Sequence, residues 1–218
     1  MLYVLLLPVC LMLLIEQLKQ WSLAESIAAA LGLAYLLLAV RRNLWCWVCA
    51  FASTSIYLVI FWRASLYMQT ALQVFYLVMA GVGFYDWKRG RGGDGEVAIR
   101  SWTLPQHLAA AVLVICATAI NGWLLTRETH AVAPYLDSFV TWGSVITTWM
   151  VARRVIENWL YWVVVDGIAA YLYLTQQLYP TTLLFIIYIG IVIRGFVVWR
   201  REQRTQQEHP LKVSDVAG

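Results

Sequence analysis

The chain has 218 residues, of which 61% are hydrophobic and 13% are charged, and its formal net charge is +4. Soluble domains are about half apolar and about a quarter charged, so this composition excludes an ordinary soluble domain and indicates a membrane protein. Nucleic-acid binding needs basic residues gathered on a soluble surface, and here they flank apolar runs instead.

Eight apolar runs follow one another along the chain, and each approaches the roughly 20 residues that a membrane-spanning helix needs. The runs do not alternate between apolar and polar residues, as the strands of an outer-membrane barrel do. Because lipid offers the backbone no hydrogen-bond partners, we predict an all-α integral membrane protein with about eight transmembrane helices. The predicted spans cover residues 2–18, 22–40, 44–62, 66–85, 104–126, 134–151, 159–175 and 179–199.

The segments outside the main apolar runs also carry predictions. The first run, Met1 to Ile15, is apolar but has neither a basic leading segment nor a small-residue cleavage site, so we expect a retained peripheral helix rather than a signal peptide. The glycine-rich segment from Lys88 to Arg100 predicts a flexible connector. The polar segment from Glu202 to Gly218 predicts a disordered tail.

Basic residues gather at alternate ends of the predicted spans. With eight spans, 12 of them fall on one side of the membrane and 3 on the other. Cytoplasmic loops carry the excess of Lys and Arg, so both termini are predicted to be cytoplasmic. The residues on the basic side are Arg41, Arg42, Lys88, Arg89, Arg91, Arg100, Arg153, Arg154, Arg200, Arg201, Arg204 and Lys212, against Lys19, Arg63 and Arg127 on the other.

Two apolar segments share a pattern of residues at a distance of 112 positions. The pattern pairs Tyr67, Tyr76, Gly83 and Trp87 with Tyr179, Tyr188, Gly195 and Trp199. Each copy follows a Trp-rich segment, one beginning at Asn43 and the other at Asn158. The copies lie four spans apart and so run in the same direction, which is typical of a transporter whose parallel repeats hold the substrate between them. We predict a peripheral helix over 1–20, three-helix repeats over 21–89 and 131–201, a connector with a linking helix over 90–130, and a cytoplasmic tail over 202–218.

Polar and aromatic side chains share one face of the fourth and eighth spans. Gln69, Gln73 and Tyr76 follow helical spacing on the fourth span, and Tyr188 occupies the matching face of the eighth. Two amides one turn apart inside a membrane helix suit the amide or hydroxyl groups of a substrate. A hydrogen-bonded interface between helices is the alternative.

The seventh span carries a charged residue, Asp166, about two turns from its start. A charge inside the membrane costs about 2.5–3.5 kcal/mol even on insertion scales, which suggests a function, and a structural partner for a buried donor is the alternative. Trp159 and Trp162 lie on the same face of this span. Together with Trp47 they are candidates for an aromatic site that binds a planar cation.

Other polar and aromatic residues fit simpler roles. Glu157 and Asn158 are predicted either to cap the seventh span or to form a cytoplasmic gate. His107 and His130 fall near opposite sides of the membrane, so we predict no catalytic cluster, no metal and no cofactor. The tryptophans assigned to the membrane interface are Trp21, Trp62, Trp87 and Trp199.

These residues together resemble the PnuC family of transporters. The resemblance covers about residues 22–201 and is carried by 157–162 with Asp166, by 43–47, and by Gln69, Gln73 and Tyr76. It implies a SWEET-like bundle of three, one and three helices, commonly a homotrimer, in the bacterial inner membrane. It also implies uptake of nicotinamide riboside, a precursor of NAD, by facilitated diffusion, with a cytoplasmic kinase trapping the substrate by phosphorylation.

Several alternatives for the function stay open. Related members carry thiamine or riboflavin, which are also aromatic, and uptake is proton-coupled if Asp166 exchanges a proton. A membrane enzyme and a purely structural protein are the competing classes. Thr181 stands where the first copy of the repeat has Gln69, so the two halves are expected to contact a substrate unequally.

Overall fold

The computed structural model describes residues 22–63, 67–90, 98–128 and 133–208. The predicted first span and most of the glycine-rich connector lie outside these residues, as does the end of the tail. The described residues form seven helices. Apart from these, they contain one isolated β-bridge, between Arg100 and Val155. The helices are α2 (Leu23–Val40), α3 (Cys46–Arg63), α4 (Tyr67–Arg89), α5 (Leu104–Glu128), α6 (Pro134–Ala152), α7 (Asn158–Thr175) and α8 (Tyr179–Glu208).

The seven helices coincide with the last seven predicted spans, and the largest difference is at α8. This helix continues to Glu208, beyond the predicted limit at residue 199, so the prediction of a disordered tail is wrong for residues 202–208. Its extension is rich in Arg, Glu and Gln, which favour a helix without needing an apolar environment. By length and composition α2, α3, α5 and most of α8 are apolar enough to cross a membrane. The other three helices carry much of the polar lining of a cavity described below.

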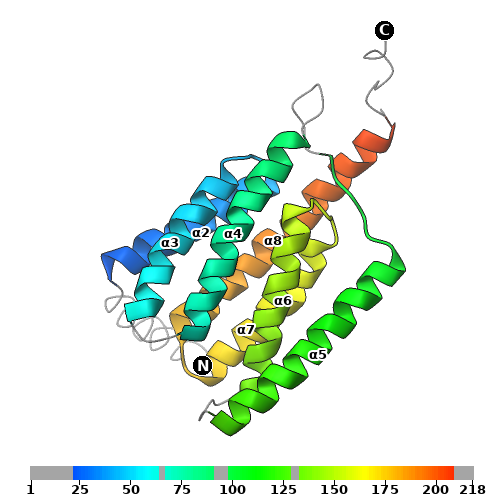
Figure 1. Ribbon diagram of the computed structural model, residues 1–218. Helices are drawn as coiled ribbons and strands as arrows, with labels where there is room; N and C mark the ends of the chain where they lie inside the picture. The colour runs from blue at the N-terminus through cyan, green and yellow to red at the C-terminus, as the bar shows by residue number, and fades with distance from the viewer. Residues whose placement is uncertain (1–21, 64–66, 91–97, 129–132, 209–218) are drawn as a thin grey trace, which may run out of the picture.

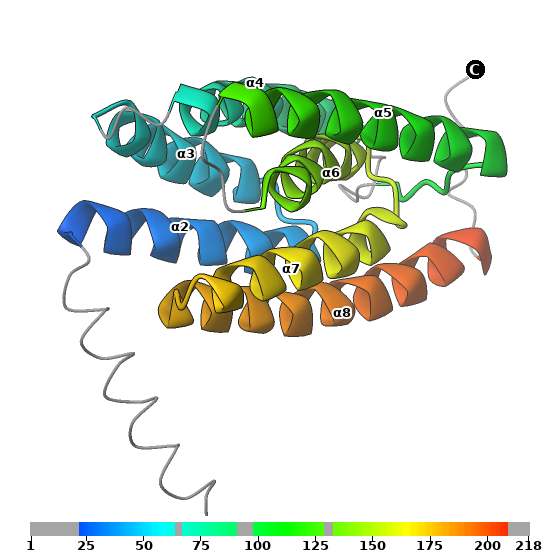
Figure 2. The same ribbon diagram turned by 90° about the horizontal axis from the view of Figure 1, so that it is seen from below.

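The helices run alongside one another in a single elongated bundle (Figures 1 and 2). Consecutive helices pack in two groups, α2 with α3 and α4, and α6 with α7 and α8. The groups meet where α4 contacts α6 and where α2 contacts α8. The remaining helix, α5, lies on the outside against α6 (Figure 1). Four helices, α2, α4, α6 and α8, end at the same end of the bundle, which is where the basic residues gather.

Two tryptophans join the groups by reciprocal hydrogen bonds. Trp87 at the end of α4 donates from Nε1 to the carbonyl oxygen of Val151 in α6, at 3.1 Å. Trp199 in α8 donates to the carbonyl oxygens of Ala39 and Val40 in α2, at 3.2 Å each. The last carbonyls of a helix have no partner within it, and these buried oxygens accept from the indoles, those of Ala39 and Val151 in addition to a backbone N–H of the following turn.

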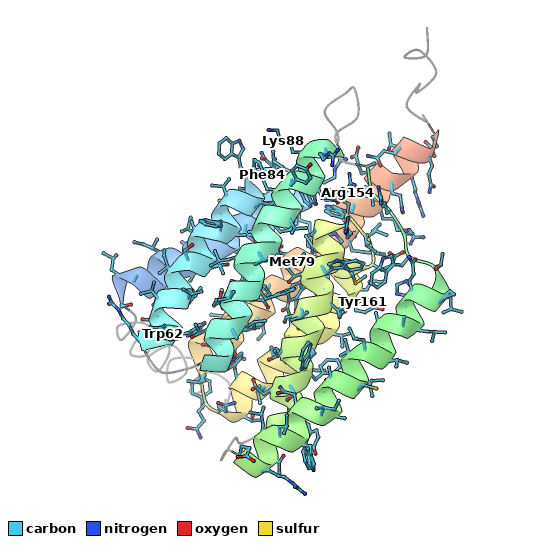
Figure 3. All side chains as sticks on the ribbon, in the orientation of Figure 1. Trp62, Met79, Phe84, Lys88, Arg154 and Tyr161 are labelled. Carbon is cyan, nitrogen blue, oxygen red and sulfur yellow. The ribbon has the colours of Figure 1, made fainter. Side chains whose placement is uncertain are left out.

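This arrangement corrects the assignment of Trp87 and Trp199 to the membrane interface. Both side chains are 0% exposed. Periodicity alone cannot separate an indole at a lipid interface from one inserted between two helix groups, since both lie near the end of a span. Trp62 is an exposed tryptophan (Figure 3), and Trp21 lies outside the described residues.

Four indoles form a continuous row across the basic end of the bundle. Trp47 meets Trp87 edge to face with 5.4 Å between ring centroids, and Trp159 meets Trp199 in the same way at the same distance. Trp87 and Trp199 join the two pairs at 6.0 Å. We call Trp47, Trp87, Trp199 and Trp159 the tryptophan row.

The tryptophan row shows how the two Trp-rich segments align with each other. Aligning their first residues, Asn43 and Asn158, gives the wrong pairs. Asn43 and Asn158 are 115 positions apart, whereas Trp47 and Trp159 are 112 apart and make equivalent contacts. Each packs on a glycine of the following helix, Trp47 on Gly83 and Trp159 on Gly195. The packing of an indole on a glycine therefore sets the register, rather than the order of the tryptophans in the chain.

Ion pairs hold the turns at the basic end. Arg154, whose φ is 63°, pairs with Asp86 at 3.4 Å, and Arg42, whose φ is 54°, pairs with Glu202 at 3.0 Å. Burial lowers the pKa of the Arg154 guanidinium, and the charge of Asp86 acts in the opposite direction. The two arginines stand 112 positions apart, each in the turn after a helix of its group (Arg154 in Figure 3).

Candidate functional site

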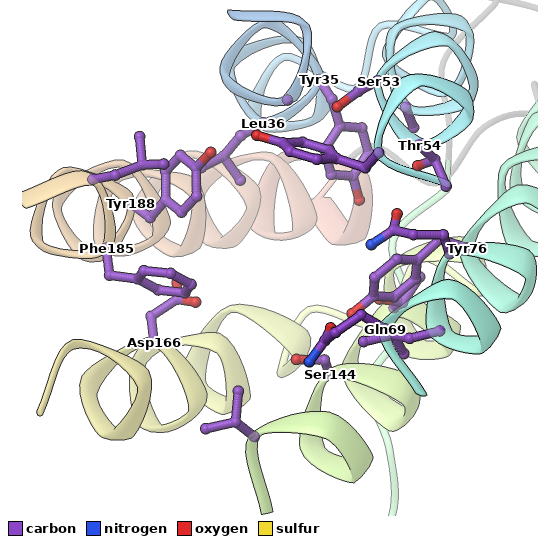
Figure 4. A pocket seen from close by; sticks show the side chains of 18 of the residues that line it. Tyr35, Leu36, Ser53, Thr54, Gln69, Tyr76, Ser144, Asp166, Phe185 and Tyr188 are labelled. Carbon is purple, nitrogen blue, oxygen red and sulfur yellow. The ribbon is translucent and has the colours of Figure 1, made fainter. Parts of the chain in front are cut away.

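A cavity of about 570 Å³ lies between the two helix groups (Figure 4). Its lining includes residues from the first turns of α2, α4, α6 and α8, namely Glu25, Gln69, Asp137 and Thr181. At the other end it reaches Trp47, part of the tryptophan row. The row is buried and lies between the cavity and the basic end of the bundle. The cavity therefore extends from the end where these four helices begin and is closed toward the end where they finish.

Most of the residues predicted to bind a substrate line this cavity. They are Trp47, Gln69, Gln73, Tyr76, Trp162, Asp166 and Tyr188. They come from α3, α4, α7 and α8, so helices far apart in the chain line the same cavity. The volume falls within the range of about 300–1,000 Å³ that is usual for small-molecule pockets.

Trp159 does not line the cavity, although the sequence places it on the same face as Trp162. It is 1% exposed and packs on Gly195 and Trp199. Trp159 lies about one turn nearer the start of α7 than Trp162 does. Its ring therefore packs in the tryptophan row instead of facing the cavity. The structure therefore gives Trp159 a place in the layer behind the cavity.

Glu157 and Asn158 also lie away from the cavity, Glu157 at the end of the turn before α7 and Asn158 at the first position of that helix. Glu157 Oε2 accepts a hydrogen bond of 3.2 Å from the backbone N–H of Trp102, and its side chain does not cap α7. Asn158 is fully buried and donates from Nδ2 to the carbonyl oxygen of Val155. Both residues thus join the turn to neighbouring backbone at the basic end.

The wall formed by the first group and α6 is rich in neutral polar groups. Gln69 and Gln73 lie one turn apart on α4, and Gln73 is buried. Tyr76 and Ser144 of α6 both point into the cavity at this wall (Figure 4). Thr54 of α3 faces the same space (Figure 4). This wall offers amide and hydroxyl groups that suit a polar, uncharged part of a ligand.

The wall formed by α7 and α8 is charged and aromatic. Asp166 is 3% exposed and lies beside Phe185 at the edge of the open space (Figure 4). Its carboxylate has no hydrogen bond or ion pair with any residue that the structure describes, so the structural-partner interpretation finds no support there. Phe185 stacks on Tyr173 with 5.3 Å between centroids and meets Tyr188 edge to face at 5.8 Å.

The charged residues that line the cavity in the described part of the chain all have one sign. Glu25, Asp137 and Asp166 are part of this lining, and no described Lys, Arg or His is. A buried carboxylate without a protein partner gains most from a ligand that is itself positively charged. The site therefore favours cations over anions.

The sequence analysis missed Glu25 and Asp137 as residues of the cavity. Neither acid is among the residues predicted to bind a substrate. The two stand 112 positions apart, like Tyr76 and Tyr188. Applying the repeat distance to every polar residue, rather than to the two matching segments alone, would have identified this acidic pair.

A bundle of apolar helices around a polar and aromatic cavity of this size defines a membrane protein that binds a small molecule between its two helix groups. Comparison with known families matches residues 22–201 to the family described as nicotinamide mononucleotide transporter. The chain belongs to this family, which is the PnuC family of vitamin transporters.

Similar proteins support the same assignment. The riboflavin/roseoflavin transporter RibM of Streptomyces davaonensis is 28% identical over 195 residues, covering 84% of this chain and 88% of the relative. The nicotinamide riboside transporter PnuC of Escherichia coli strain K12 is 26% identical over 215 residues, covering 87% and 90%. The fold is similar to a crystal structure of the vitamin B3 transporter PnuC, with a TM-score of 0.71, 20% identity and 90% of each chain covered.

Proposed function

We propose that the protein takes up nicotinamide riboside by facilitated diffusion. The observation that carries this proposal is Asp166, a buried carboxylate with no partner among the described residues, facing a cavity with an aromatic wall and an amide wall. Nicotinamide riboside combines a pyridinium cation, a carboxamide and a ribose. The cation suits Asp166 and the aromatic rings, and the carboxamide and hydroxyl groups suit Gln69 and Gln73.

The acidic lining favours the riboside over its phosphorylated form. A mononucleotide carries phosphate charge, and like charges in a partly desolvated cavity repel each other. The three lining carboxylates, with no Lys, Arg or His among the described lining residues, therefore disfavour the mononucleotide named in the family description. Phosphorylation in the cytoplasm would produce an anion that the site rejects, which fits trapping by a kinase.

Riboflavin is the second candidate, because a relative that shares 28% identity is a riboflavin and roseoflavin transporter. The aromatic rings of the cavity suit a flavin as well as a pyridinium. Thiamine, an aromatic cation, fits the charge of the lining equally well. The uncharged flavin leaves Asp166 without a partner, and this ranks nicotinamide riboside above riboflavin.

We extend the proposal to the whole assembly in the membrane. Segments 21–89 and 131–201 form two three-helix repeats, and α5 within 90–130 links them so that both run in the same direction. Segment 1–20 adds a peripheral eighth helix, and segment 202–218 forms a cytoplasmic tail. The protein works as a homotrimer in the bacterial inner membrane. The basic end of the bundle faces the cytoplasm, which places Glu157 and Asn158 on the side where a cytoplasmic gate would be.

Binding to the purified protein tests the proposed function. We expect calorimetry to show binding of nicotinamide riboside that excess thiamine or riboflavin displaces only weakly. Tight binding of riboflavin or thiamine instead would move the assignment to that vitamin. Absence of binding for all three would contradict the proposal that this cavity carries a vitamin.

Gln73 is expected to contribute selectivity through its amide. Replacing Gln73 with leucine leaves the substrate's carboxamide or ribose without a partner, which costs about 1–3 kcal/mol. We expect the Gln73→Leu variant to lose its discrimination between nicotinamide riboside and an analogue lacking the carboxamide or a ribose hydroxyl. Competition binding measures this, and discrimination equal to the wild type would remove Gln73 from substrate recognition.

Trp162 is expected to bind the ring of the substrate by stacking. Trp162→Ala should weaken binding more than Trp162→Phe, because phenylalanine retains a flat aromatic face and a cation–π interaction is worth about 2 kcal/mol when it is desolvated. Calorimetry on both variants measures the difference. Equal losses for alanine and phenylalanine would indicate that Trp162 acts by filling space.

A further inference from the structure

The two carboxylates at the outer end of the cavity are in different environments. Glu25 and Asp137 occupy the first turns of α2 and α6, at positions 112 apart, and both line the cavity. Glu25 Oε2 accepts a hydrogen bond of 2.6 Å from the backbone N–H of Ser22, and the Ser22 hydroxyl accepts one from the N–H of Glu25. This reciprocal cap uses the carboxylate of Glu25 to start its helix.

Asp137 has no comparable contact. Its helix begins after Ala133 without a side-chain cap, and its carboxylate has no hydrogen bond or ion pair with any residue in the described ranges. The side chain is half-buried in the cavity wall. Of the two acids at this end, Asp137 is therefore the one whose carboxylate has no hydrogen bond to a described residue and can pair directly with a ligand.

A second carboxylate without a partner lies deeper along the same side of the cavity. Asp166 of α7 is buried and lines the same cavity as Asp137. Tyr173 also lines the cavity and stacks on Phe185, the ring beside Asp166 (Figure 4). The acids and the aromatic surface between them belong to α6, α7 and α8, the second helix group.

From this arrangement we infer that Asp137 is a specificity-determining residue that captures a cationic substrate at the outer end of the cavity and directs it along the second helix group toward Asp166. A charge at the mouth of a low-dielectric cleft raises the association rate of oppositely charged ligands. A neutral ligand gains nothing from it. This inference rests on the proposed transport of a small vitamin-like molecule and adds the step by which a cation enters.

Stopped-flow measurement of association, read from intrinsic tryptophan fluorescence, tests the inference on the full-length protein in uncharged detergent. The probes are nicotinamide riboside and thiamine as cations and riboflavin as the neutral ligand. Measurements at about 0.01 M and about 0.15 M salt compare Debye lengths of about 30 Å and about 8 Å. We expect Asp137→Asn to slow association of the cations about tenfold at low salt, with a much weaker salt dependence, while association of riboflavin stays unchanged.

Two variants separate this role from a structural one. Asp137→Glu keeps the charge and is expected to restore the association rate and its salt dependence. Glu25→Gln removes the matching first-turn acid and is expected to reduce the salt dependence less than Asp137→Asn does, because the N–H of Ser22 already occupies that carboxylate and it cannot pair as freely with a ligand. A loss of salt dependence in Glu25→Gln equal to that in Asp137→Asn would overturn the specific role of Asp137.

The outcomes also separate this inference from the proposed function. Cation binding by the wild type with an unchanged rate and salt dependence in Asp137→Asn would overturn the role of Asp137 and leave the proposed function standing. Wild-type protein that binds neither nicotinamide riboside nor thiamine would overturn both. A slower association of riboflavin in Asp137→Asn, matching that of the cations, would show a change of shape and contradict electrostatic capture.

Discussion

Replacing Asp166 with asparagine is expected to weaken binding of nicotinamide riboside by at least about 30-fold, because losing one partner of a buried charge pair costs about 2–5 kcal/mol. Asparagine keeps the size of the side chain but removes its charge. The carboxylate makes no hydrogen bond or ion pair with a described residue, so no protein contact in that part of the chain is lost. Calorimetry measures the affinity, and thermal unfolding in detergent is expected to show a stability at least equal to that of the wild type.

The repeat supplies a control for the Asp166 variant. Thr54 stands 112 positions before Asp166 and lines the opposite wall of the cavity. We expect the double variant Thr54→Asp/Asp166→Asn to recover part of the affinity, because it returns one negative charge to the same space. An Asp166→Asn variant with wild-type affinity for the cation, or a loss of thermal stability that accounts for the weaker binding, would remove Asp166 from recognition.

Replacing Gly83 with alanine is expected to lower the free energy of unfolding by about 1–3 kcal/mol, as overpacking of a full core does. A Cβ at Gly83 would lie 2.3 Å from Cζ2 of Trp47. The ring of Trp47 cannot move aside easily, since it packs on Trp87 and Tyr35. Thermal unfolding in detergent measures the change, and Gly195→Ala is expected to behave alike because its Cβ would lie 2.6 Å from Trp159.

Neighbouring glycines on the same helices serve as matched controls. A Cβ at Gly81 of α4 or at Gly190 of α8 would meet no atom within 4 Å apart from its chain neighbours and the backbone of its own helix. Alanine is favoured over glycine inside a helix by about 0.8–1.0 kcal/mol, so both control variants should be as stable as the wild type or slightly more stable. Equal stability of Gly83→Ala and Gly81→Ala would mean that the tryptophan row does not hold the two groups rigidly.

The helical architecture follows from the sequence because the membrane imposes one requirement on every span. Each backbone group must find its partner within the segment, so long apolar runs predict helices and their limits almost directly. The cavity residues on α4 and the charge of Asp166 were also predictable, since a polar group in an apolar span stands out. The repeat distance of 112 positions between Tyr76 and Tyr188 likewise predicted that both residues belong to one site.

What the sequence by itself determined is a helical membrane protein with a repeated pattern and most of the residues of one internal site. The tertiary structure decided which aromatic and acidic residues face that site. Trp159 and Trp162 lie on one helix face, yet packing against Gly195 and Trp199 takes Trp159 into the layer behind the cavity. Glu25 and Asp137 look equivalent in the repeat, and only the contact with Ser22 separates them. Spacing along a helix fixes the direction of a side chain, but the partner it meets depends on how the two helix groups come together.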